Sequence, residues 1–187
     1  MREDVSPLRQ FGILAALFLC LTSTHCFLFG GVKQTGRVKS YEPGRVITQK
    51  GFYNVGELPP DWKRMKVGSY RTVAFYNDAL KSSIETDAFC DSSYDDASLK
   101  VLTTHLFFNI QDRQIKWEKS FMLDQRGALR SMAQGKVDGV PIVLDTVVIK
   151  KDECLFDFAL VSEPGHYAKA ALDFETFFKG FRFQGNL

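Results

Sequence analysis

Residues 140–162 read VPIVLDTVVIKKDECLFDFALVS and decide the fold. Two runs rich in β-branched and aromatic residues flank a short polar break, Lys150-Lys151-Asp152-Glu153. Side chains alternate between the two faces of a strand, and in both runs each face carries apolar residues. A break this short can join only antiparallel neighbours, so the stretch predicts a central β-hairpin that is buried on at least one side.

The order of the predicted elements defines an α+β fold. Apolar alternation predicts further strands, and apolar residues at helical spacing predict two helices. The strands are expected at 69–76, 82–90, 113–123 and 128–137, and the helices at about 97–110 and from Asp173 onwards. With the central hairpin the order is β-β-α-β-β-β-β-α, an antiparallel sheet of about six strands with two helices packed on it.

Polar residues and a glycine mark the expected ends of the two helices. Asp95 or Asp96 is the expected N-cap of the first helix and Asp173 that of the second, since a carboxylate accepts hydrogen bonds from free helix amides. Gly180 occupies the position expected of a C′ residue. The acidic stretch 91–96 has an alternative interpretation as a cation loop, but it lacks the glycine pivot and the distal Glu of an EF-hand. Capping therefore explains it better.

The N-terminal residues are typical of an export signal followed by a linker. An unbroken apolar run at 11–21, FGILAALFLCL, has the length of a signal-peptide core and is shorter than a membrane span of about 20 residues. We therefore expect a signal peptide with a degenerate lipobox at 1–26. Glycines, a proline and scattered cations then predict a flexible tether at 27–50, and residues 51–187 are expected to form a single domain.

Residues 21–26, LTSTHC, resemble a bacterial lipobox, in which a cysteine follows small residues just after the apolar core. Ser23 and Thr24 suit the pattern, whereas His25 stands where Gly, Ala or Ser is usual. The resemblance implies that Cys26 becomes the lipidated first residue of the mature protein and that its acyl chains hold the protein on a membrane. Cleavage near Ser23 and an uncleaved anchor are the alternatives.

Cys90 and Cys154 are the two cysteines expected inside the mature domain, because Cys20 leaves with the signal peptide. Both lie at strand ends of an exported protein, where disulfides persist. If they face the same side of neighbouring strands, their side chains come close enough for a bridge. We therefore predict a Cys90–Cys154 disulfide, and the alternative is a pair of buried free thiols.

The element order, together with an aromatic C-terminal helix that ends in Phe178-Lys179-Gly180-Phe181, resembles the PsbP/DcrB-like fold of small exported or peripheral proteins. The resemblance covers about Tyr53 to Phe183. Members of that family are mostly non-catalytic, and they dock onto membrane complexes or serve as accessory lipoproteins. The resemblance therefore implies an accessory role and supplies no active-site residues.

The sequence contains no set of residues typical of an enzyme or a cofactor site. No GxSxG, HExxH, CxxC or phosphate-binding glycine loop occurs, and His105 and His166 have no partner at ligand spacing. The acids of the predicted strands and turns are separate along the chain, namely Asp138, Asp145, Asp152 and Asp157. The net charge of +2 comes without a basic cluster, which argues against nucleic-acid binding. We expect no catalytic residue, no metal and no cofactor.

These observations favour a non-enzymatic accessory lipoprotein, anchored on the periplasmic face of the outer membrane and in contact with an envelope protein complex. The alternative is a periplasmic carrier or sensor that holds an apolar ligand between the sheet and a helix, as the 17 phenylalanines suggest. A hydrolase built around His105 or His166 is the third hypothesis, and it requires a Ser, Cys or Asp within hydrogen-bond reach of either ring.

Overall fold

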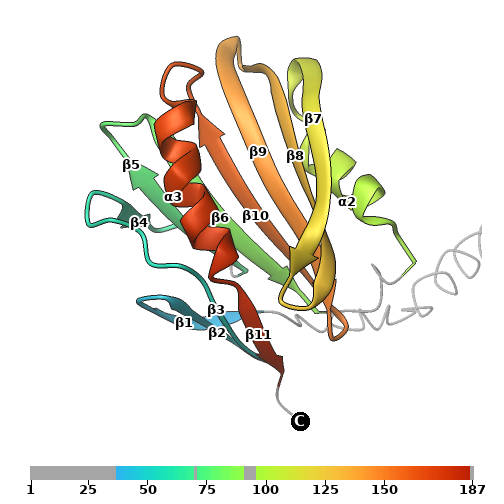
Figure 1. The fold of residues 1–187 in the computed structure, drawn as a ribbon. Helices are drawn as coiled ribbons and strands as arrows, with labels where there is room; N and C mark the ends of the chain where they lie inside the picture. Colours follow the sequence, from blue (N-terminus) through green and yellow to red (C-terminus); the bar gives the residue numbers. More distant parts are fainter. Residues whose placement is uncertain (1–36, 70, 91–95, 186–187) are drawn as a thin grey trace, which may run out of the picture. The chain divides into compact units, whose positions relative to one another are not determined.

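The computed structural model describes residues 37–69, 71–90 and 96–185, which form two antiparallel sheets and the helices α2 (Leu99–Leu106) and α3 (Tyr167–Lys179) (Figure 1). The larger sheet runs in the order β4 (Lys63–Met65), β5 (Thr72–Asn77), β6 (Ser82–Phe89), β10 (Cys154–Ser162), β9 (Val140–Lys151), β8 (Arg126–Val137) and β7 (Gln111–Leu123). The predicted α+β class is confirmed, with seven strands in this sheet rather than about six.

Three tight hairpins build the half of the sheet from β7 to β10. Each turn has two residues, Asp124-Gln125, Asp138-Gly139 and Asp152-Glu153, and all six have φ between 45° and 81°. Positive φ at both central positions gives the turn type whose twist matches that of the flanking strands. The predicted central hairpin is confirmed, since β9 and β10 pair from Cys154↔Lys151 to Ser162↔Val143.

The smaller sheet corrects one prediction. It runs in the order β1 (Val38–Glu42), β2 (Arg45–Thr48), β3 (Gly51–Asn54) and β11 (Arg182–Gly185). Val46 of β2 is fully buried, so the flexible tether predicted for 27–50 is wrong over 38–48. Short strands rich in Gly and basic residues are recognisable only through their pairing, and β3 pairs with the distant β11. Residues 27–36 lie outside the described part of the chain.

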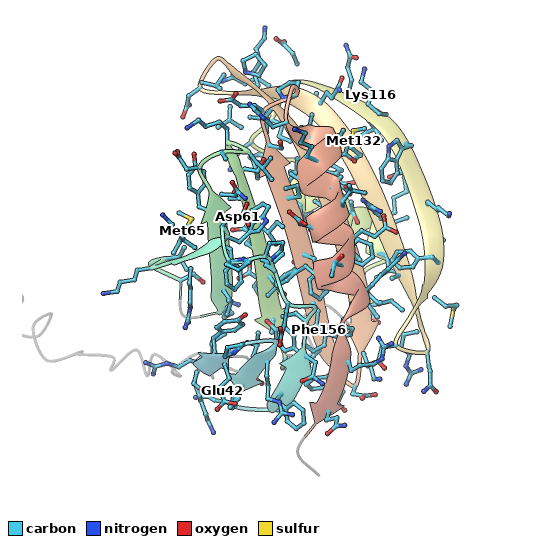
Figure 2. The ribbon with its side chains drawn as sticks, turned by 60° about the vertical axis from the view of Figure 1, so that its left-hand side comes forward. Glu42, Asp61, Met65, Lys116, Met132 and Phe156 are labelled. Carbon is cyan, nitrogen blue, oxygen red and sulfur yellow. A yellow bond between two sulfur atoms is a disulfide. The ribbon has the colours of Figure 1, made fainter. Side chains whose placement is uncertain are left out.

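Helix α3 covers one face of the larger sheet with aromatic side chains (Figure 2). Phe156 of β10 lies near the C-terminal end of this helix (Figure 2), where it contacts Phe181 and Phe183. The helix starts six residues before Asp173, so the predicted N-cap is wrong, and His166 occupies that position. Asp173 instead accepts a hydrogen bond from Trp62 Nε1 at 2.9 Å and ties the helix to the chain before β4.

Gly180 ends α3 for a different reason from the one predicted. Its φ is −71°, which any residue adopts, so it is not a left-handed C′ residue. A Cβ on Gly180 would lie 2.1 Å from the backbone nitrogen of Gly56, and a Cβ on Gly56 would lie 2.1 Å from the carbonyl oxygen of Thr176. The two glycines therefore allow close backbone packing, in which Gly56 N donates to Phe177 O at 2.8 Å.

Helix α2 packs on the opposite face of the larger sheet and is shorter than the predicted 97–110. Its N-cap is Ser98, whose Oγ accepts a hydrogen bond from Val101 N at 3.3 Å, so capping by Asp96 is wrong. Asp95 and the rest of the acidic stretch 91–95 lie outside the described residues. Leu102 packs on Val148 and Leu155 of the sheet.

Candidate functional site

The predicted disulfide is present in the structure. The sulfur atoms of Cys90 and Cys154 are 2.09 Å apart, and the two α-carbons are 4.0 Å apart. The strand pairing implied by the prediction is also present, because β6 and β10 are neighbours from Leu155↔Phe89 to Ser162↔Ser82. The predicted lipidation site, Cys26, lies outside the described residues.

The interface between α3 and the sheet is filled. Five phenylalanines in it have no exposed surface, namely Phe156, Phe158, Phe174, Phe177 and Phe181. Their rings meet edge-on or tilted, for example Phe158 and Phe181 with centroids 5.4 Å apart. Such packing is typical of a solid protein core. The phenylalanine content therefore reflects core packing at this interface.

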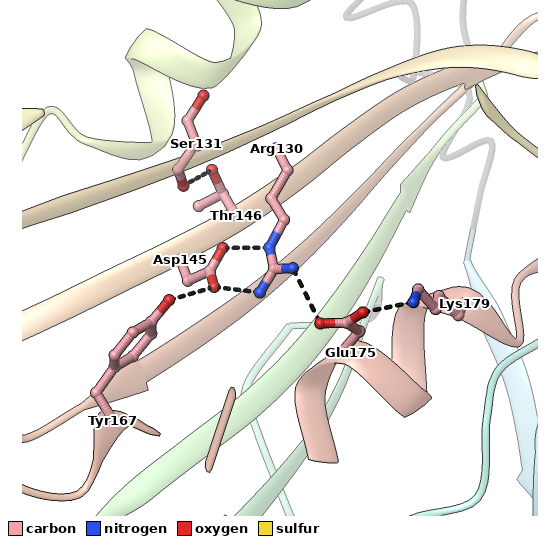
Figure 3. Close-up of polar contacts among 7 residues, drawn as sticks. All are labelled: Arg130, Ser131, Asp145, Thr146, Tyr167, Glu175 and Lys179. Carbon is pink, nitrogen blue, oxygen red and sulfur yellow. Dashed lines mark hydrogen bonds and ion pairs between the residues drawn. The ribbon is translucent and has the colours of Figure 1, made fainter. Parts of the chain in front are cut away.

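A polar network borders this interface at Arg130 (Figure 3). The guanidinium donates to Asp145 Oδ1 and Oδ2 at 3.0 and 2.7 Å and contacts Glu175 at 3.5 Å. Tyr167 also donates to Asp145 Oδ2, at 2.9 Å. Burial alone lowers the pKa of the Arg130 guanidinium, but the hydrogen bonds and charge of Asp145 raise it above its ordinary value. Each carboxylate has protein donors, so the network suits a structural role.

An apolar groove of about 470 Å³ lies on the other face of the sheet, beside the end of α2. Among the described residues, its lining is mostly aliphatic and includes a single titratable side chain, Glu85; the other residues are Leu106, Asn109, Ile110, Val137, Val140, Ile142, Leu144, Ala159 and Val161. Val140 remains 54% exposed at its rim. The volume falls in the range of about 300–1,000 Å³ that ligand sites occupy.

A row of polar side chains crosses the same face of the sheet next to the groove. The polar row consists of Thr72, Asp87, Asp157, Thr146 and Ser131. Register pairs Thr72 with Asp87 and Asp87 with Asp157. The row then steps along β10, because Thr146 pairs with Ser131 and faces Ala159, two residues from Asp157. Among the described residues, two buried side-chain atoms lack a hydrogen-bond partner, and both belong to this row: Asp157 Oδ1 and Ser131 Oγ. Because an unpaired buried polar group is unfavourable, such atoms mark a place where a ligand group could bind.

Three carboxyl groups, those of Glu85, Asp87 and Asp157, lie near the Asp157 end of the polar row, and the pKa of each is raised. Burial, followed by the charges of Asp87 and Glu85, raises the pKa of Asp157 to about 8. Burial also raises the pKa of Asp87, although a hydrogen bond from Thr72 and the charge of Arg71 oppose the change. The pKa of Glu85 is raised by burial and then by Asp87. Perturbed carboxyls beside a groove are typical of functional sites.

Asp157→Asn tests this electrostatic environment. Between about pH 4 and pH 8 the folded protein keeps the Asp157 proton while the unfolded chain has lost it, so rising pH weakens the fold by up to about 1.4 kcal/mol per pH unit. Urea denaturation should show that, from pH 5 to pH 7, the free energy of unfolding falls by about 2 kcal/mol more in wild type than in the Asn variant. Equal losses in the two proteins would contradict the buried neutral carboxyl.

The remaining predicted side chains stay apart from the groove and the polar row. His105 is exposed on α2, and His166 precedes α3 on the opposite face. Within the described ranges, no group of three or more His, Cys, Asp and Glu residues could hold a metal ion. Nor does that part of the chain include a helix that is long and apolar enough to cross a membrane.

Sequence reasoning missed the acidic site because it treated Asp157 as an isolated strand residue. The available signal was that Glu85 and Asp87 share one face of a predicted strand, opposite Ile84 and Thr86. Only the register of β6 with β10 adds Asp157 to them. Predicting the site therefore required the pairing of β6 with β10, which a bridge between Cys90 and Cys154 implies.

Comparison with known proteins identifies solved structures with a similar fold. No protein-family model and no curated protein matches the sequence. The solution structure of cyanobacterial PsbP (CyanoP) from Synechocystis is similar with a TM-score of 0.51 and 13% identity, over 82% of this chain and 96% of that one. A crystal structure from Bacteroides thetaiotaomicron gives a TM-score of 0.54 and 16% identity over 77% of this chain, which spans only 49% of that protein. At such identity the likeness shows the fold, and it confirms the PsbP-like fold predicted from the sequence.

Proposed function

We propose that this protein is a non-enzymatic accessory protein of the cell envelope that binds a small apolar molecule in the groove beside α2. The groove itself is the observation that supports binding. Its aliphatic lining continues from the sheet residues Ile142 and Val161 to Leu106 of the helix. Burial of such surface stabilises a complex by about 25 cal/mol per Å² of apolar area. A site between the sheet and a helix agrees with the carrier alternative, but its lining is aliphatic and the phenylalanine-rich interface with α3 is filled.

The composition of the groove supports binding in preference to catalysis. Glu85 is the one titratable residue in the described part of the lining, whereas acid–base chemistry generally uses two positioned groups in reach of the substrate. The fold supports an accessory role through its likeness to PsbP of Synechocystis, although the likeness itself concerns architecture. A partner complex in the envelope remains part of the proposal.

Location outside the cytoplasm is supported by the disulfide and by the N-terminal sequence. A buried Cys90–Cys154 bridge persists in oxidising compartments and is rare in the cytosol. The apolar run at 11–21 and the cysteine at position 26 support export and lipid anchoring at the periplasmic face of the outer membrane.

Cys26→Ala tests the anchor. Wild-type cells labelled with a fatty acid should yield a labelled, membrane-bound protein, because the acyl chains are attached at Cys26. The alanine variant should be unlabelled and should leave the membrane fraction, while Cys20→Ala should behave like wild type. An unlabelled wild-type protein would contradict lipid anchoring.

Binding of 1-octanol tests the groove. Calorimetric titration of the whole protein should detect binding that weakens roughly tenfold in Val140→Asp/Val161→Asp, since a charge in an apolar site disfavours an alkyl chain. Leu172→Asp is the matched control, because Leu172 is 68% exposed on α3 at the opposite face. Absence of octanol binding, or equal loss in the control, would contradict the proposed function.

A further inference from the structure

The acidic end of the groove allows the chemical class of the ligand to be inferred, on the basis of the proposed function. Glu85 lines the groove and stands directly opposite Ala159, a second lining residue. The next pair on the same face of these strands is Asp87 and Asp157. Because two residues along a strand span about 7 Å, the three carboxyl groups lie at and just beyond one end of the groove.

Of these three acids, Asp157 is the one whose buried carboxyl lacks a hydrogen-bond donor at one oxygen. The residue is 8% exposed, its Oδ1 atom has no hydrogen-bond partner among the described residues, and its cross-strand neighbour on β6 is another acid, Asp87. A buried carboxyl in that position is stabilised by a donor, and a positively charged donor also reduces the repulsion among the acids.

Among the described residues no side chain donates a hydrogen bond to Asp157 Oδ1, which leaves this role open to a ligand. Across β9 the register partner of Asp157 is Val148, and the helix side contributes Leu102 near the same position. Burial raises the pKa of Asp87, and the positive charge of Arg71 opposes this rise. The Cζ atom of Arg71 lies 4.5 Å from the ring centroid of Phe89, which follows Asp87 on β6, so Arg71 is on the opposite side of Asp87 from Glu85. Among the described residues, the titratable and charged groups near Asp157 are Asp87 and Glu85, Arg71 beyond Asp87, and Lys150 on β9, whose Nζ donates to Ala97 O at 2.8 Å.

We infer that the groove binds an amphiphilic molecule that carries a protonated amine. Its apolar chain lies on Ile142, Val140 and Val161, and its ammonium group donates hydrogen bonds to Asp157 and to Glu85 or Asp87. An ammonium has three donors and can satisfy several acceptors at once. An organic cation also fits the aliphatic lining, which a hydrated metal ion does not.

Three probes of matched chain length test this inference: octylammonium, 1-octanol and octanoate. Titrated below their micelle-forming concentrations at pH 7, they should bind the whole protein in that order of affinity. Octylammonium should bind at least about tenfold more tightly than octanol, because a hydrogen bond between charged groups is stronger than a neutral one. Octanoate should bind most weakly, since like charges repel at the acidic end.

The double variant Glu85→Gln/Asp157→Asn should lose this preference while it retains the affinity of wild type for octanol. Retained octanol binding shows that the variant is folded and that the groove is intact. Asp138→Asn is the matched control, since it removes one negative charge from the exposed turn between Val137 and Val140 without changing the polar row. The control should keep the preference for octylammonium.

Proton release provides a second readout. Burial raises the pKa of Asp157 to about 8, so the carboxyl is largely neutral at pH 7 and should lose its proton when an ammonium binds. The heat of octylammonium binding should therefore vary with the ionisation enthalpy of the buffer, and in the double variant it should not. A side chain with only a structural role would not produce this dependence.

The outcomes separate the inference from the proposed function. If no probe binds, the groove is not a ligand site, and the proposed function fails together with the inference. If octanol and octylammonium bind equally, the groove function stands and the amine specificity is wrong. If the preference persists in Glu85→Gln/Asp157→Asn, these carboxyls do not recognise the amine, and the inference is overturned.

Discussion

Replacing Asp145 with alanine should destabilise the fold by about 3–5 kcal/mol, because the change leaves a buried guanidinium without its counter-charge. The Arg130 and Asp145 side chains are 16% and 0% exposed and form two parallel hydrogen bonds. Phe178 also packs on Arg130, with its ring centroid 5.0 Å from the Cζ atom. Urea denaturation at pH 7 measures the loss.

Two comparison variants make the cause of this loss identifiable. Glu175→Ala removes the other carboxylate from the same guanidinium, but Glu175 is 40% exposed, so about 1 kcal/mol or less is expected. The double variant Arg130→Met/Asp145→Leu should be more stable than Asp145→Ala, because it removes both charges and keeps apolar volume. Equal losses in Glu175→Ala and Asp145→Ala, or a double variant less stable than Asp145→Ala, would contradict an uncompensated buried charge as the cause.

The central part of the fold could be predicted because local signals coincide there. The turns Asp138-Gly139 and Asp152-Glu153 interrupt runs of alternating apolar residues, and both the hairpins and their register follow from such patterns. The pairing of β6 with β10 is not local. It was predicted only because Cys90 and Cys154 suggested a bridge between these strands.

The wrong predictions concern elements whose structure depends on contacts between residues far apart in the sequence. Val46 is buried in a short strand that looks like linker in the sequence, and its sheet is completed by β11 at the other end of the chain. Helix α3 starts at Tyr167, well before the expected cap, because 168–172 (AKAAL) are strong helix formers. Asp173, which looks like a cap, instead pairs with the distant Trp62.

The candidate site could be predicted less well than the fold. The sequence shows aliphatic residues such as Ile142 and Val161 on predicted strands, but it does not show that α2 leaves part of this face uncovered. Nor does it show that Glu85 and Asp157, more than seventy residues apart in the sequence, lie on one face. Both features depend on strand register and on where a short helix ends, which local patterns do not determine.

Loss of the Cys90–Cys154 bridge should reduce the free energy of unfolding by about 4 kcal/mol, since the bridge closes a loop with a sequence separation of 64 residues. Guanidinium denaturation of the oxidised protein, the reduced protein and Cys90→Ala/Cys154→Ala measures the effect. The reduced protein and the double variant should agree within about 1 kcal/mol, because alanine retains most of the packing at these buried positions.

The position of the bridge leads to a more specific expectation. It joins β6 and β10 three residues beyond the Asp87–Asp157 pair, so it holds together two strands that carry facing acids. Like charges directly opposite in a sheet are destabilising. Without the bridge, their repulsion is opposed by the strand ladder and its packing and, at Asp87, by the Thr72 hydrogen bond and the Arg71 charge. Hydrogen exchange of the amides at 155–157 should therefore accelerate on reduction. The acceleration should be larger at pH 8 than at pH 5, because at pH 5 the acids are more protonated and repel one another less. In a reduced Asp157→Asn variant this pH dependence should largely disappear; if it persists, repulsion at Asp157 does not open these strands.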